Sequence, residues 1–114
     1  NIHQYAIVFI RLYPAVYDEP PTYTTEWLFP LLDKITSYNA EWIIYAHSDE
    51  PVSRTDYAEI DRQLRTIGSL VDEHHGSREA VTAALVDRGI DLADETVQER
   101  LEAFLSGYQA YKQD

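Results

Sequence analysis

Two patterns of apolar residues divide the chain of 114 residues. In its first third, short runs of β-branched and aromatic residues predict strands near 4–13 and 41–47, because such side chains suit a pleated, buried surface. From about residue 54 onward, apolar residues recur every three or four positions, which is the period of one face of a helix. The pattern predicts an α+β fold: a short buried sheet packed by about four helices, with a helical C-terminal half.

The run at 4–13 is the most hydrophobic part of the chain and is apolar at both odd and even positions. That composition is typical of a strand buried on both faces, and Pro14 stops it. A helix between this strand and 41–47 would form a β-α-β unit, right-handed if the strands are parallel. Two strands are too few for a stable sheet. Either the proline-rich loop 14–25 adds a strand, or a second copy of the chain completes the sheet; we favour the homodimer.

The first helix has an ambiguous beginning. Thr25 could cap a helix that starts at Glu26, but Pro30 would then lie in its second turn. Proline lacks a backbone N–H, and its ring clashes with the carbonyl four residues earlier. We therefore predict a short turn at 26–29 and a helix that begins at Pro30 and ends near Tyr38.

Capping residues mark the three later helices. Ser53, Ser77 and Asp94 are expected to cap helices at their N-termini, because their side-chain oxygens accept hydrogen bonds from free backbone N–H groups. Gly76 and Gly89 are expected to end the first two of these helices, and 48–52 is predicted to be a loop.

Each of these helices has an apolar stripe that should face the core. The helix over 54–75 carries six residues at alternating spacings of three and four: Tyr57, Ile60, Leu64, Ile67, Val71 and His74. The next carries Ala80, Val81, Ala84 and Leu85. The last carries Val97, Leu101, Phe104, Leu105, Tyr108 and Tyr111.

Length and composition indicate one soluble domain over residues 1–114. The sequence has no cysteine, which excludes disulfides, thiolate metal sites and cysteine nucleophiles. No apolar run approaches the length of a membrane span, so we expect a cytoplasmic protein that does not bind membranes.

The formal net charge of −11 changes the picture most. Sixteen of the twenty acids lie in residues 41–114, against seven bases there, which leaves that part with a charge of −9. Such a field repels nucleic acids and attracts basic surfaces.

The strongest concentration of acids predicts a binding surface in the helical half. Glu95, Glu99 and Glu102 follow one another at spacings of four and three, which places them on one helix face. The candidate partner-binding residues are Asp87, Asp91, Asp94, Glu95, Glu99, Glu102, Asp72 and Glu73. We interpret the chain as a small non-enzymatic binding protein for a basic protein surface, such as a nucleic-acid-binding protein. Its carboxylates would mimic phosphates, as in anti-restriction and anti-CRISPR inhibitors. Adaptation to a salt-rich cytoplasm would explain the same acidity.

An aromatic surplus fits either interpretation. With fourteen Phe, Trp and Tyr residues, the core of a small domain cannot hide every ring. Some of the following should therefore lie at the surface, where they could join an interface: Tyr13, Tyr17, Tyr23, Trp27, Tyr38 and Tyr57.

The segment 77–105 supports an alternative function. It resembles the helix-turn-helix of arginine-repressor-type and winged-helix regulators in the order of Gly89, Ile90, Thr96, Val97, Arg100 and Leu101. The resemblance implies a DNA-binding regulator with Gln98 and Arg100 as its contacts. The acids on the same helix would repel DNA.

Catalytic and metal sites are not predicted. The sequence has no GxSxG motif and no glycine-rich phosphate loop, and His47, Ser48 and Asp49 are too close in sequence to form a triad. The group Asp72-Glu73-His74-His75 matches no known metal-ligand spacing and is typical of a helix C-terminus. We expect no catalytic residue, no metal and no cofactor.

Overall fold

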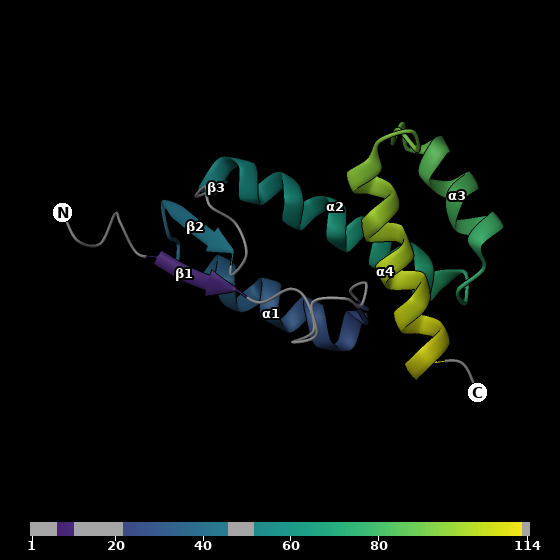
Figure 1. Ribbon diagram of the computed structural model, residues 1–114, viewed down its shortest axis with the longest axis horizontal. Coiled ribbons are helices and arrows are strands. Elements are labelled where there is room, and N and C mark those ends of the chain that lie inside the picture. The colour runs from purple at the N-terminus through teal and green to yellow at the C-terminus, as the bar shows by residue number, and fades with distance from the viewer. Residues whose placement is uncertain (1–6, 11–21, 46–51, 113–114) are drawn as a thin grey trace.

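A computed structural model describes residues 7–10, 22–45 and 52–112. In chain order, the elements are β1 (Ile7–Ile10), α1 (Thr25–Ser37), β2 (Trp42–Tyr45), β3 (Val52–Ser53), α2 (Arg54–Glu73), α3 (Arg78–Asp87) and α4 (Glu95–Tyr111). Figure 1 shows the short sheet at one end of the molecule and α3 with α4 at the other. The predicted α+β class, with four helices in the described residues and a helical C-terminal half, is confirmed.

The sheet has the strand order β1-β2-β3. β1 and β2 are parallel, with Ile7 opposite Trp42 and Ile10 opposite Tyr45, and α1 connects them along the chain. β3 is antiparallel to β2. The third strand of the described sheet is thus formed by Val52 and Ser53, and the prediction of a loop through 52 is wrong there. Two residues are too few to show the alternation by which a strand is recognised.

Parts of the two predicted strands and the neighbouring loops lie outside the described residues. These parts are 4–6, 11–13, 14–21 and 46–51. Within the described residues, both predicted strands are present over their central four residues.

Helix α1 begins five residues earlier than predicted. Thr24 is its cap and accepts a hydrogen bond from the Trp27 N–H at 3.3 Å, so Pro30 lies inside the helix. Pro30 and Glu26 are both exposed, and water can reach the carbonyl that Pro30 leaves without a donor. On the opposite face, Leu28 and Leu32 are fully buried. Burial of this face outweighs the cost of the proline, and the prediction of a turn at 26–29 is wrong.

The caps of the other helices are confirmed. Ser53, Ser77 and Asp94 accept hydrogen bonds from backbone N–H groups at 3.1, 3.3 and 2.8 Å. Gly76 and Gly89 follow α2 and α3 with φ values of 75° and 77°, a conformation that glycine adopts without strain. Helix α2 ends at residue 73, two residues before its predicted end.

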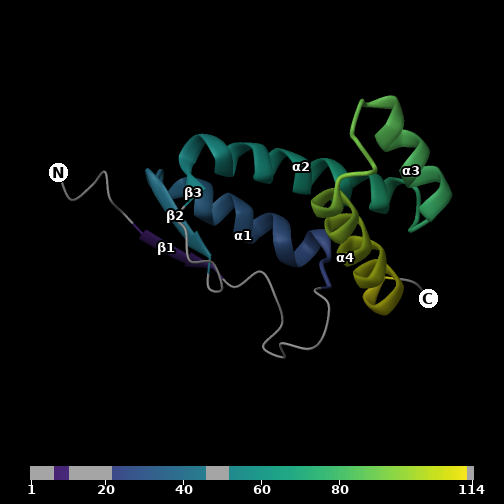
Figure 2. The same cartoon turned by 45° about the horizontal axis from the view of Figure 1, so that its top comes forward.

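Helix α2 lies at the centre of the core and packs against α1, α3 and α4 (Figure 2). The three stripes supply most of the buried residues, among them Leu64, Val81 and Phe104. Tyr111 is 74% exposed, so its predicted place in the core is wrong. It belongs to the last turn of α4.

A close backbone contact joins the beginning of α1 to α4. The Tyr23 N–H donates to the Ala103 carbonyl at 2.9 Å, although that carbonyl lies within a helix. A Cβ atom on Gly107 would lie 1.9 Å from the Tyr23 oxygen. Glycine at this position therefore lets the chain before α1 lie directly against α4.

The aromatic residues divide between core and surface. Tyr23 and Tyr57 are buried, while Trp27 and Tyr38 are about half exposed, at 49% and 50%. Trp27 stacks on the Tyr23 ring with a centroid separation of 6.3 Å. Tyr13 and Tyr17 lie outside the described residues.

Candidate functional site

Five of the eight predicted site residues lie together at the end of the molecule far from the sheet. We call this group the acidic turn: Asp87, Asp91, Asp94, Glu95 and Glu99. It extends from the last residue of α3 through the connection into the second turn of α4 (Figure 1). All five residues are exposed.

Local hydrogen bonds order the connection. One carboxylate oxygen of Asp91 accepts from the Ala93 N–H at 2.9 Å, and one of Asp94 accepts from the Thr96 N–H at 2.8 Å. Each aspartate therefore has a structural role as well as its charge. Glu95 and Glu99 are one helical turn apart, about 5–6 Å between their Cβ atoms. The backbone holds these charges close together.

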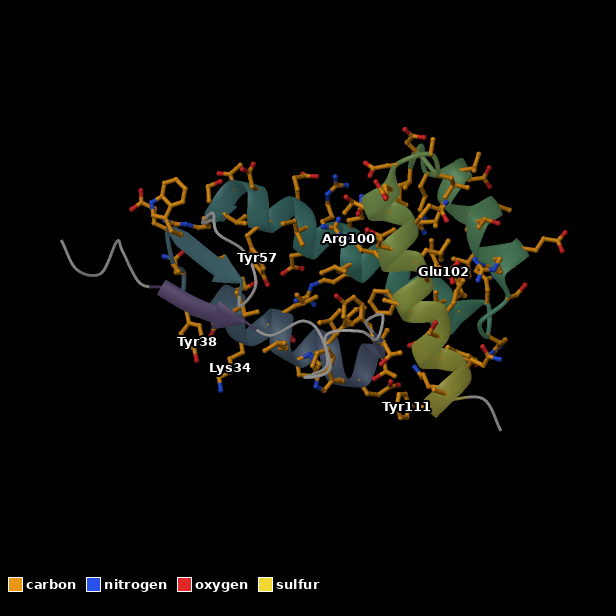
Figure 3. The ribbon with its side chains drawn as sticks, in the orientation of Figure 1. Lys34, Tyr38, Tyr57, Arg100, Glu102 and Tyr111 are labelled. Carbon is orange, nitrogen blue, oxygen red and sulfur yellow. The ribbon has the colours of Figure 1, made fainter. Side chains whose placement is uncertain are left out.

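Glu102, the third residue of the predicted stripe, differs from the other two glutamates. Arg78 of α3 donates two hydrogen bonds to its carboxylate, one of them at 3.0 Å. The Arg78 hydrogen bond lowers the pKa of Glu102, although partial burial opposes the shift. Figure 3 shows Glu102 on the side of α4 that faces α3. Arg78 therefore neutralises its charge at the half-exposed surface between α3 and α4.

Asp72 is also neutralised, at the opposite end of α3. The Lys112 ammonium group donates to Asp72 at 2.6 Å and forms an ion pair with Glu26 at 2.7 Å, and Thr25 donates a further hydrogen bond to Asp72. Burial lowers the pKa of Lys112, but the bonds to Asp72 and Glu26 outweigh burial and raise it. Glu73 is exposed beside this cluster. The sequence did not reveal the cluster, because Lys112 is 40 residues from Asp72 and still farther from Glu26.

Six acids of the described residues form ion pairs, and none of the six belongs to the acidic turn. Arginine and lysine pair with Glu26, Asp33, Glu59, Asp61, Asp72 and Glu102. Across residues 7–10, 22–45 and 52–112, no such pair involves a member of the acidic turn. Val86, which precedes Asp87, is 58% exposed and places an apolar side chain beside the charges.

The two residues proposed to contact DNA are used within the fold. The Gln98 side chain donates to the Leu92 carbonyl at 2.6 Å. Arg100 donates to the Gln63 side chain of α2, and Figure 3 shows Arg100 on the α2 side of α4. Both residues are part-buried. A DNA-contacting role would require these hydrogen bonds to break.

The histidine group forms the end of α2. His74 is the C-cap residue, and His75 has a φ of 54°. Within the described parts of the chain, no three His, Asp or Glu residues are placed to hold a metal ion. His47, Ser48 and Asp49 lie outside those parts. No helix among the described residues is long and apolar enough to cross a bilayer.

Comparisons with known proteins identify no relative. No family model matches the chain, and neither a curated protein nor a solved structure is significantly similar to it.

Proposed function

We propose that the protein is a non-enzymatic binding protein whose acidic turn docks on a basic protein surface. The observation that carries the proposal is the unbalanced charge of the turn. Five exposed carboxylates lie within residues 87–99 with Arg88 as the only base of that segment, a net charge of −4. Six other acids of the described surface form ion pairs, whereas these five form none among the described residues. Glu41, Asp56, Glu73 and Glu79 also form none there, but they are not concentrated in one short segment.

Self-repulsion makes such a surface costly, which supports a role for it. Like charges one helical turn apart destabilise a helix by a few tenths of a kcal/mol per pair. A basic partner would relieve this repulsion and gain speed of association from electrostatic steering.

The chemistry of the turn suits a partner that ordinarily binds nucleic acid. Closely spaced, fixed carboxylates can occupy a groove whose arginines and lysines otherwise contact phosphates. We therefore propose inhibition by nucleic-acid mimicry, in the cytoplasm, as the mode of action. Self-association through the sheet belongs to the same proposal.

The experiment begins with capture of partners from the native host on the immobilised chain, followed by identification by mass spectrometry. The purified partner is then titrated with the wild type, with Glu95→Lys/Glu99→Lys, and with Glu59→Lys/Glu79→Lys as a control of equal charge. We expect the first double variant to weaken binding about tenfold or more, and the control to change it far less. Duplex DNA should compete with the wild type for the partner.

Three results would count against the proposal. Equal losses in the two double variants would show that overall charge, and not the acidic turn, determines binding. Unchanged binding in Glu95→Lys/Glu99→Lys would remove the turn as the site. A gel shift of duplex DNA by the wild type at low salt, lost in Arg100→Ala, would support the helix-turn-helix alternative.

A further inference from the structure

The outer edge of β1 has no partner strand within residues 7–10, 22–45 and 52–112. In the described residues β1 pairs only with β2, and Figures 1 and 2 show no other labelled strand beyond it. A strand pairs through alternate N–H and C=O groups on each side, so an edge strand presents a row of unpaired donors and acceptors. Backbone groups of this kind are complementary to another strand.

The two edges of the sheet differ in their protection. Natural edge strands are blunted by charges, prolines or short length. β3 has two residues and leads directly into Arg54, whose N–H donates to the Glu41 carbonyl at 2.9 Å. β1 has the sequence Ile-Val-Phe-Ile, with neither charge nor proline. Within the described residues, β3 is therefore the shorter and the better protected of the two edges.

A second copy of this chain suits this edge, because an edge strand can pair antiparallel with its own copy about a two-fold axis and the distribution of charge permits the contact. Two molecules of net charge −11 repel each other, so stable self-association needs a neutral contact far from the acids. Residues 4–10 contain no acid and no base. The molecule is 48 Å long, and the acidic turn lies at the end opposite β1. Pairing at β1 would separate the two acidic turns by far more than the Debye length of about 8 Å at physiological salt.

We infer that two copies pair through β1 in antiparallel orientation about a two-fold axis. The two sheets then join into one of six strands, in the order β3-β2-β1-β1-β2-β3. With the axis at Val8, Val8 lies opposite Val8 of the second copy, because directly opposed residues of an antiparallel pair have side chains on the same face. The two Val8 Cα atoms would then be about 4.5–5.5 Å apart, the separation of directly opposed residues in an antiparallel pair.

The dimer would present two acidic turns on opposite ends. This consequence rests on the proposed function: a partner with two basic sites, or two neighbouring partners, would be bound with avidity. Dimerisation itself is measured without any partner, so its failure and the failure of the proposed function are distinguishable.

The mass of the full chain in solution tests the inference. Light scattering during gel filtration should give twice the 13.2 kDa of one chain. Val8→Lys places two positive charges at the two-fold axis and should give monomers, whereas Ala83→Lys, on the exposed side of α3, should leave the dimer intact. A monomeric wild type at every soluble concentration, a larger oligomer, or a dimer that persists in folded Val8→Lys would overturn the inference.

A second variant covers the case in which Val8→Lys does not fold. The chain has no cysteine, so one introduced thiol is a unique probe. Under mild oxidation Val8→Cys should form a disulfide-linked dimer much faster than Ala83→Cys, since Cα atoms within about 7 Å can be bridged. Equal rates for the two variants would show that the β1 edges do not meet.

Discussion

Gly107 shows how one side chain, or its absence, decides the packing of this fold. The chain before α1 lies against α4 where a Cβ would come within 1.9 Å of a backbone oxygen. Gly107→Ala should therefore lower the free energy of unfolding by about 2 kcal/mol or more, even though alanine favours helix. Urea denaturation followed by circular dichroism measures this change.

The neighbouring Ser106→Ala is the matched control. It also adds helix propensity to α4 and should change stability by no more than about 0.5 kcal/mol. If Gly107→Ala were as stable as the control, the contact with Tyr23 would not be as close as described.

The ion pair between Arg78 and Glu102, also a contact of single residues, should make the stability of the fold depend on pH. The Arg78 hydrogen bond lowers the pKa of Glu102 below its ordinary value of 4.5. The pair therefore contributes stability above that value, and the contribution is lost as the pH falls through the lower pKa of the folded state. Both side chains are about half exposed, so the contribution is a few tenths of a kcal/mol.

We expect Arg78→Gln to melt at a lower temperature than the wild type at neutral pH. The difference should narrow as the pH falls below 4.5 and Glu102 takes up a proton. Arg62→Gln, which removes a more exposed pair with Glu59, should show a smaller difference. A difference for Arg78→Gln that stays constant with pH would mean that Arg78 acts through packing alone.

At the scale of elements, the sequence predicted those helix boundaries that depend on residues close to one another in the chain. Ser53, Ser77 and Asp94 were recognised as caps because a capping side chain bonds within three residues of itself. The beginning of α1 was mispredicted because burial of its inner face, a tertiary effect, outweighs the local penalty of Pro30.

The candidate site was predictable to a similar extent. The acidic turn is continuous in sequence, so its members were found together. The neutralisation of Glu102 and Asp72 depends on cations 24 and 40 residues away, which no local pattern reveals. The two-residue strand β3 was missed because it has no period to detect.

Pro30 offers a test of that account of α1. Pro30→Ala restores a backbone donor for the Glu26 carbonyl and removes the ring clash, and the exposed side chain makes no buried contact that would be lost. We expect the free energy of unfolding to rise by up to about 3 kcal/mol. Lys34→Ala, one turn later on the exposed face, is the control and should change it only slightly. A less stable Pro30→Ala variant would mean that the proline has a packing role.

At the scale of the whole molecule, charge and core are separated along the long axis. The sheet and the lead-in to α1 are rich in apolar and aromatic residues, while the acidic turn projects from the opposite end (Figure 1). The core holds α3 and α4 in place through buried residues such as Val81 and Leu101, and the turn between them is free to carry charge. If the acidic turn serves to bind a partner, the protein should stay folded at low salt with a small loss of stability. If the acidity is an adaptation to a salt-rich cell, the protein should need salt to stay folded.

Removing charge from the turn distinguishes these origins of the acidity. Asp87→Asn/Glu99→Gln should raise the melting temperature at low salt by a few degrees, because it removes an acid from the C-terminal end of α3 and the like-charge repulsion between Glu95 and Glu99. The gain should vanish near 1 M salt, where the Debye length is about 3 Å. Glu59→Gln, which loses the ion pair with Arg62, should show no gain. If the wild type unfolds at low salt and the double variant does not, salt adaptation explains the acidity. If the wild type stays folded at low salt and is only slightly less stable than the variant, the result supports a binding surface. The repulsion between its carboxylates would then be relieved when a basic partner binds.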